Sequence, residues 1–246
     1  PKAFAFEFDH TKWHGFYAGA SVDALQSGIN LHESVKSGGT YFNYTQDAPQ
    51  VRATGKKHLS PKDFSGGIFG GYERKLDKVI LGAELSANSL LINNAYSFTG
   101  RYISDPNILY ILRYSLQAYS QESLRLKLGF VEQQWLGYLT GGATTTYIKY
   151  TPSYMDDNAQ AGSGLPGAYG KNALHKIQLG WTVGGGVEYA LNNTWSVKAD
   201  YTYSNFGSVH SNYPIIPTPT LSEFSAAMNA KANLIIHSLS LGLIYR

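Results

Sequence analysis

The stretch WTVGGGVEYALNNTWSVKADYTY, residues 181–203, alternates between bulky apolar residues and small or polar ones. Before the Asn192–Asn193 pair, one parity holds Trp181, Val183, Val187, Tyr189 and Leu191, interrupted only by Gly185. After it, the pattern resumes with Trp195, Val197, Ala199, Tyr201 and Tyr203. Successive side chains of a strand point to opposite faces. The stretch therefore predicts a β-hairpin with one apolar side, which faces either a protein core or lipid.

Composition narrows the class of protein. The chain has 246 residues, of which 15% are charged, against about 25% in ordinary soluble domains. It contains no cysteine, which excludes disulfides and thiol chemistry. The net charge of +3 comes from scattered residues, so a nucleic-acid surface is not indicated. No apolar run approaches the ~20 residues of a membrane helix.

The alternation recurs along the chain. Eight strands of about ten residues or more are predicted: 13–24, 63–75, 79–91, 120–131, 135–150, the two strands of the hairpin, and 232–246. Only the strand at 135–150 alternates poorly, which leaves its faces unassigned. Long connections at about 25–62, 92–119, 151–172 and 207–231 alternate with short ones at 77–78, 132–134 and 192–193. An antiparallel up-and-down meander then has all its long loops at one end, as transmembrane β-barrels do.

Alternation alone does not say which face is outside, because a soluble barrel of the lipocalin type places its apolar face around a ligand. The polar face here is rich in glycine, serine and threonine, which suits the narrow interior of an eight-stranded barrel. Aromatic residues also lie near the predicted strand ends, as they do at membrane boundaries. The residues expected there are Trp13, Tyr72, Trp135, Trp195, Tyr203 and Tyr245. Both features favour lipid outside.

Charged residues of both signs lie on the polar face. They are Asp23, Glu73, Glu84, Arg125, Lys127, Lys176, Glu188, Lys198 and Asp200. An unpaired charge in a narrow lumen is costly, so we expect these side chains to form a charge network that plugs the barrel. In particular, Glu84 or Glu188 is expected to pair with Arg125 or Lys198. The alternative is that some of these groups are simply hydrated at the barrel ends.

The hairpin resembles that of small OmpA-like outer-membrane β-barrel proteins of Gram-negative bacteria, often labelled porin-family surface antigens. Their W-T-x-G-x-G-x-E-Y-x-[LF] strand and following N-W-S-x-K-x-E-Y are matched by Trp181, Thr182, Gly184, Gly186, Glu188, Tyr189, Leu191, Trp195, Ser196, Lys198 and Tyr201, with Asp200 in place of the last Glu. WHGFYAGASV (13–22), FSGGIFGGYERKLDKVILGAELS (64–86) and HSLSLGLIYR (237–246) are similar to other strands of the family. The long loops match nothing in it.

The resemblance implies an eight-stranded antiparallel transmembrane β-barrel in the bacterial outer membrane, with short periplasmic turns and long extracellular loops. Residues 1–12 are expected to be a periplasmic N-terminal leader, and 13–246 a single barrel domain. Family members usually end in an aromatic residue that the assembly machinery reads, whereas this chain ends in Tyr245–Arg246. Either a terminal Phe is missing or the insertion signal is atypical.

No catalytic, cofactor or metal site is predicted. None of the seven histidines forms an H-E-x-x-H or other close metal-binding pair. His175 and His237 fall on the outward face near strand ends. The glycine clusters at 66–71 and 184–186 lack the Gly-Lys-[ST] of a phosphate loop, and packing in the lumen explains them.

Function is expected to be structural and non-enzymatic, with a closed or narrow lumen. Partners are expected to be outer-membrane lipid and lipopolysaccharide, together with a protein contacted by the outer loops or the N-terminal tail. Two alternatives stay open: an adhesin or ligand-binding receptor that uses loops 25–62 and 207–231, and a small barrel enzyme acting on lipid or peptide. The sequence leaves the oligomeric state undetermined.

Overall fold

The computed structural model describes residues 13–36, 39–42, 44–158, 167–217 and 224–246. Within them, ten strands and one helix form. They are β1 (Gly15–Val35), α1 (Asp47–Thr54), β2 (Lys57–Leu59), β3 (Lys62–Leu76), β4 (Val79–Arg101), β5 (Leu109–Glu132), β6 (Trp135–Asp156), β7 (Ala168–Lys171), β8 (Leu174–Ala190), β9 (Trp195–Pro217) and β10 (Ala226–Tyr245). Residues 1–12, expected to be a leader, lie outside the described part of the chain.

Eight long strands form a ring. Each pairs antiparallel with the next in the order β1, β3, β4, β5, β6, β8, β9, β10, and β10 returns to pair with β1 from Ala18↔Tyr245 to Val35↔Met228. Such closure leaves no free strand edge at the level of the membrane, where hydrocarbon offers no hydrogen bonds to the backbone. The ring confirms the predicted up-and-down architecture.

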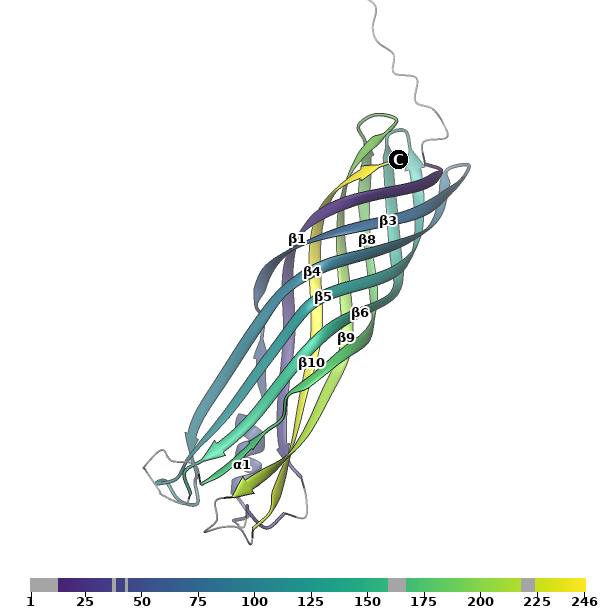
Figure 1. The fold of residues 1–246 in the computed structure, drawn as a ribbon. Coiled ribbons are helices and arrows are strands. Elements are labelled where there is room, and N and C mark those ends of the chain that lie inside the picture. Colours follow the sequence, from purple (N-terminus) through teal and green to yellow (C-terminus); the bar gives the residue numbers. More distant parts are fainter. Residues whose placement is uncertain (1–12, 37–38, 43, 159–166, 218–223) are drawn as a thin grey trace, which may run out of the picture.

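The tight turns all lie at one end of the ring, together with the C-terminus, and α1 lies at the opposite end (Figure 1). Asp77 and Gln133 adopt positive φ values of 56° and 55° in two of these turns. A short left-handed residue of this kind lets two antiparallel strands connect with minimal chain. The end that carries these turns corresponds to the periplasmic side in the predicted topology.

The strands run much further than the sequence indicates. β5 contains 24 residues, about 80 Å at 3.4 Å per residue, whereas ~9–11 residues cross a bilayer. The predicted loop boundaries are therefore corrected. β1 continues to Val35 inside the expected loop 25–62, β4 and β5 occupy most of 92–119, and β9 and β10 occupy most of 207–231. About half of each of six long strands, β1, β4, β5, β6, β9 and β10, stands beyond the lipid. We call this part of the barrel the outer half and the rest the inner half.

Three short elements complete the wall of this outer half. Toward the outer half, β3 extends only as far as its first residue, Lys62. Beyond that point β1 pairs with β2, from Ile29↔Leu59 to Leu31↔Lys57. β8 begins only at Leu174, and beyond it β7 lies between β6 and β9. The helix α1 packs beside β1 with Val51 fully buried. No helix among the described residues is long and apolar enough to cross a membrane.

Polarity inverts along the strands. In the inner half of β5, Leu126 and Leu128 are exposed while Lys127 is buried. In its outer half, Leu112 is buried and Arg113 is exposed. The buried residues of the outer half form a hydrophobic core: Leu25, Ile29, Leu31, Tyr41, Val51, Leu90, Ile92, Tyr102, Tyr110, Leu112, Tyr114, Leu116, Ala118, Ile148, Tyr150, Tyr154, Ala168, Phe206, Val209, Tyr213, Ile215, Ala226, Met228, Ala230, Ala232, Leu234 and Ile236. The inner half is thus arranged for lipid outside, and the outer half for water outside.

Two irregularities keep the correct residues facing inward across this change. The register of β5 shifts between Ala118 and Gln121, and the inward-facing parity changes from even to odd there. In β9 the inward parity changes after Phe206, where Gly207 adopts a φ of 65°. A bulge inserts an extra residue and so re-aims the side chains that follow. β1, β4, β6 and β10 keep one parity throughout.

Candidate functional site: a charged, sealed lumen

Four charged side chains form a closed ring near the periplasmic end of the lumen. The Lys127 ammonium lies 2.6 Å from Glu73 and 3.5 Å from Glu188. The Arg246 guanidinium lies 2.8 Å from Glu73 and also pairs with Glu188. Each cation therefore contacts both anions, and the ring is neutral. We call it the lower quartet, because we take the end with the tight turns as the bottom of the barrel, although Figure 1 draws that end uppermost.

A second ring lies above the first. The Arg125 guanidinium is 2.5 Å from Glu84 and 3.8 Å from Asp200, and the Lys198 ammonium is 3.4 Å from Glu84 and 3.9 Å from Asp200. Their side chains are at most 9% exposed. The Tyr17 hydroxyl donates to Glu84 at 2.9 Å. We call this ring the upper quartet.

Aromatic rings occupy the space between the charges. The Lys127 ammonium lies 4.0 Å from the centre of the Tyr138 ring, and the Lys198 ammonium lies 3.6 Å from that of Phe69. The Arg246 guanidinium stacks 4.8 Å over Trp13. A cation is attracted to the face of an aromatic ring, most strongly where water is absent. These contacts fill the cross-section that the ion pairs leave open.

The structure brings seven of the nine predicted lumen charges into the two quartets. The expected pairing of Glu84 with Arg125 and Lys198 is present. Asp23 is buried but makes no ion pair with any described residue, and it accepts a hydrogen bond from the Asn88 amide at 2.8 Å instead. The prediction that Lys176 lies in the lumen is wrong. Its side chain is exposed in the outer half of β8, beyond the last β8–β9 pair at Trp181↔Asn205.

Sequence reasoning missed Arg246, the eighth member. A signal was available, because Ser238, Ser240 and Gly242 share the inward parity of β10. Continuing that parity by two steps leads to Arg246.

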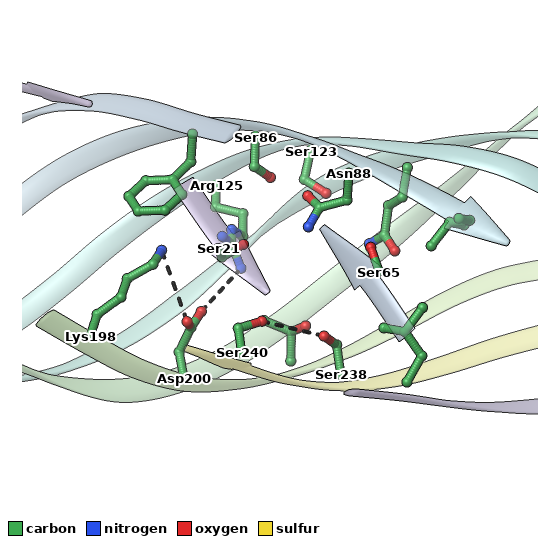
Figure 2. Close-up of a pocket in the computed structure, with 15 residues that line it drawn as sticks. Ser21, Ser65, Ser86, Asn88, Ser123, Arg125, Lys198, Asp200, Ser238 and Ser240 are labelled. Atoms are coloured by element: carbon green, nitrogen blue, oxygen red, sulfur yellow. Dashed lines mark hydrogen bonds and ion pairs between the residues drawn. The ribbon is translucent and has the colours of Figure 1, made fainter. Parts of the chain in front are cut away.

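A small polar chamber lies above the upper quartet. It has a volume of about 30 Å³, room for one or two water molecules. Figure 2 shows the side chains around it, with Lys198 and Arg125 joined to Asp200 on one side. Hydroxyl groups surround the rest, from Ser21, Ser65, Ser86, Ser123, Thr202, Ser238 and Ser240. Leu90 closes the chamber toward the hydrophobic core of the outer half.

Two girdles of aromatic side chains mark the lipid boundary. At the turn end, Trp135 packs on Tyr189 and Trp195 on Tyr245. At the other boundary, Trp181 packs on Tyr203, and His237 contacts Tyr203 and accepts or donates a hydrogen bond with the Tyr201 hydroxyl at 2.6 Å. Such rings anchor a barrel at the headgroup level.

Five of the six predicted interfacial aromatics lie on the outer surface of the barrel. Tyr72 belongs to the girdle at the turn end, where it contacts His14 and Phe16. Trp13 is a correction: it is only 3% exposed and lies inside, in a cluster with Ile80, Val131, Leu136, Tyr138 and Ala190. Trp13 has the same parity as the inward-facing Tyr17 and Asp23 of β1, so continuing the alternation would have placed it inside. This cluster forms an apolar floor below the lower quartet.

A buried carboxyl group lies in the hydrophobic core of the outer half. Glu33 is fully buried, and the Tyr213 hydroxyl donates a hydrogen bond to it. The Tyr114 hydroxyl lies beside this carboxyl group, while the Tyr150 hydroxyl has no hydrogen-bond partner in the described structure. Burial raises the pKa of Glu33 to about 7. This carboxyl group therefore changes charge near neutral pH.

A second buried carboxyl group ties the outer ends of the strands together. Asp156 accepts hydrogen bonds from the Tyr41 hydroxyl at 2.8 Å, the Tyr154 hydroxyl and the Ala168 amide at 3.0 Å. These donors come from three separate segments of the chain. Burial raises the pKa of Asp156 above its ordinary value. The contacts close the top of the outer core.

The described residues hold no group of three or more His, Asp or Glu arranged for a metal ion. His175 lies on the outer surface beside the Tyr147 hydroxyl at 3.2 Å, and His58 lies 2.8 Å from the Asn30 side chain. Neither is within hydrogen-bond reach of a described carboxylate.

The chain is similar to known proteins over most of its length. The family model described as Outer membrane protein beta-barrel domain matches residues 3–246. The 31 kDa outer-membrane immunogenic protein of Brucella melitensis is 27% identical over 205 residues, which are 81% of this chain and 73% of that protein. The 25 kDa outer-membrane immunogenic protein of Brucella abortus is 23% identical, over 73% of this chain and 68% of that protein. The crystal structure of OprG from Pseudomonas aeruginosa is 12% identical with a TM-score of 0.41, covering 96% of this chain and 99% of that one.

Glu84 contacts both cations of the upper quartet, so its neutralisation tests the quartet. Glu84→Gln leaves Arg125 and Lys198 with one anion between them, and we expect a loss of about 3–5 kcal/mol of unfolding free energy. The matched control is Ser86→Ala, two residues along the same face, which removes a hydroxyl facing the chamber and is expected to cost less than about 1 kcal/mol. Urea unfolding in lipid vesicles measures both. Equal losses would refute the quartet's contribution.

Glu33 makes the outer core sensitive to pH. The folded state holds this proton more tightly than the unfolded state, so stability falls as pH rises from about 4.5 to about 7 and is level above that. Glu33→Gln removes the charge and is expected to stabilise the protein by about 3 kcal/mol at pH 8 and by little at pH 4. Urea midpoints at the two pH values measure this. The same gain at both would contradict ionisation as the cause.

Proposed function

This chain belongs to the outer-membrane β-barrel protein family and lies in the bacterial outer membrane, and we propose that it is a closed, non-enzymatic barrel that presents its long outer half to external partners. The observation that carries the proposal is the pair of stacked quartets. Eight charged side chains neutralise one another across the lumen, between an apolar floor and a hydrophobic core.

Three successive barriers support a closed lumen. The floor around Trp13 blocks the periplasmic end, the quartets occupy the middle, and the core of the outer half fills the rest. An eight-stranded barrel has an interior just wide enough for side chains. The chamber above the quartets, about 30 Å³, has room for one or two water molecules and not for a larger solute. Ions would have to displace packed side chains at three levels.

The placement of the acidic groups supports a non-enzymatic role. Glu73, Glu84 and Glu188 are engaged in ion pairs inside the lumen, where a substrate has no access. His175 and His237 bind tyrosine hydroxyls on the outer surface. A general acid or base must lie within hydrogen-bond reach of a substrate. The glutamates are out of reach of a substrate, and the two histidines have no carboxylate of the described residues beside them.

The outer half supplies the surface for contacts with external partners. Its exposed Lys and Arg residues are Lys36, Arg52, Lys56, Lys57, Lys62, Arg101, Arg113, Lys171, Lys176 and Lys231. The described acidic residues of the same half, Glu33, Asp47, Asp63, Asp105, Asp156 and Asp157, are buried or half-buried. A surface of one sign attracts ligands of the opposite sign. This charge distribution favours anionic partners such as lipopolysaccharide, and it supports a surface-binding role over transport.

Conductance in planar bilayers tests the closed lumen. In 1 M KCl the purified protein is expected to give no steady current above that of a protein-free bilayer. A 16-stranded porin under the same conditions serves as the open control. Glu84→Gln is also expected to stay closed, because the hydrophobic outer core seals the lumen independently. A large steady conductance from the unmodified protein would contradict the proposal.

A further inference from the structure

Basic side chains form a row across three strands of the outer half. β1 and β10 pair with His32 opposite Lys231, and β10 and β9 pair with Lys231 opposite His210. Paired residues point to the same face of a sheet, and all three side chains reach the outer surface. The row is therefore fixed by the register of the strands rather than by flexible loops.

A recess lies beside this row. Its volume is about 320 Å³, and it lies between α1 and the end of β1. Arg52 and Lys56 stand at its edge, while Val35, Ala48, Pro49 and Ala53 give it an apolar lining, with Ser34 beside them. We call the recess and the row together the cationic recess. A sugar ring offers the matching combination, because its C–H face is apolar and its substituents are polar.

The cations of the recess are not neutralised within the described structure. Arg52, Lys56 and Lys231 make no ion pair with any described acidic residue. The nearest acidic residue along β1, Glu33, points into the core and not into the recess. Asp47, at the start of α1, is buried and accepts a hydrogen bond from Ser104 at 2.6 Å. Charge complementarity therefore calls for an anionic ligand.

The cationic recess stands well above the lipid. His237 of the outer girdle is paired with Gln26 of β1, and Ser34 lies eight residues further, about 26 Å along the strand. Even with the usual tilt of barrel strands, a phosphate at the lipid headgroup level does not reach this height. Phosphates at the headgroup level of the surrounding membrane are therefore out of its reach.

We propose that the cationic recess binds the sulfate or phosphate groups of an anionic saccharide presented from outside the cell's own lipid layer. Arg52, Lys56 and Lys231 hold the anionic groups, and the apolar lining packs against the sugar ring. The proposal rests on the proposed surface-binding function and names its ligand class.

His32 offers an internal reporter. Burial, followed by the charges of Lys56, Arg52 and Lys231, lowers the pKa of His32. An anion bound among these cations offsets their field and raises that pKa. By reciprocity, protonation of His32 strengthens anion binding, so affinity increases as pH falls.

The test uses the full chain in phosphatidylcholine nanodiscs with dextran sulfate as the probe and neutral dextran of equal length as its control. Binding is measured by calorimetry, and His32 is followed by NMR. We expect dextran sulfate to bind and to raise the pKa of His32, and neutral dextran to do neither. Binding of both polymers alike, or an unchanged His32 during binding, would overturn the proposal.

Two double variants separate the recess from general surface charge. Arg52→Gln with Lys231→Gln is expected to weaken binding by about tenfold or more, because charge-assisted contacts are lost. Arg113→Gln with Lys171→Gln removes the same charge from another part of the outer half, where both residues are paired across to Ser153, and is expected to change affinity by less than about twofold. Equal weakening would show non-specific attraction and refute the site.

The source of the ligand is tested separately. Nanodiscs that contain lipopolysaccharide are expected to leave dextran sulfate binding unchanged, because their phosphates lie below the recess. Loss of binding in these discs would mean that the membrane's own glycolipid occupies the recess, against the proposal. Conductance is expected to be unchanged in all of these variants, because their residues lie on the outer surface. An open lumen would therefore refute the proposed closed barrel without bearing on the recess.

Discussion

Hydrocarbon cannot form hydrogen bonds, and the inner half of this molecule follows from that constraint. Every backbone group there must pair within the sheet, which requires the ring to close between β1 and β10. The apolar residues must face outward, so the polar ones are forced together inside. Glycines at close strand contacts relieve the crowding: a side chain at Gly142 would meet the backbone oxygen of Leu124 at 1.9 Å.

Charges in such an interior are tolerated only in balanced sets. The lower and upper quartets meet this requirement, because every cation contacts two anions and every anion contacts two cations. Beyond the outer aromatic girdle the surroundings become water, and the same strands bury leucine, tyrosine and methionine instead. The barrel thus has two kinds of interior. Neutralised charges fill the lumen of the inner half, and packed hydrophobic side chains fill that of the outer half.

Where the alternation is regular, the sequence predicts the structure well. Leu124 to Phe130 alternates with Arg125 and Lys127, and the strand, its outward face and the pairing of Arg125 with Glu84 are as predicted. The prediction fails beyond Ala118, because the inward parity and the surrounding medium change within a few residues and the pattern loses its period. β6 keeps its parity throughout, but its inward residues pass from threonine to isoleucine and tyrosine, which made it look irregular. Glu33 contacts Tyr114 and Tyr213, which lie about 80 and 180 residues away in the sequence. No pattern within a single strand predicts contacts between residues so far apart.

The change of surroundings along a single strand can be measured directly with spin labels at two outward positions of β5, Leu126 and Arg113. Collision rates with oxygen, which concentrates in lipid, are compared with those of a water-soluble nickel complex for the protein in vesicles. The account predicts that the label at 126 meets oxygen and not nickel, and that the label at 113 meets nickel freely. A label at 126 that is open to nickel, or one at 113 that is shielded from it, would contradict an apolar belt that ends partway along the barrel.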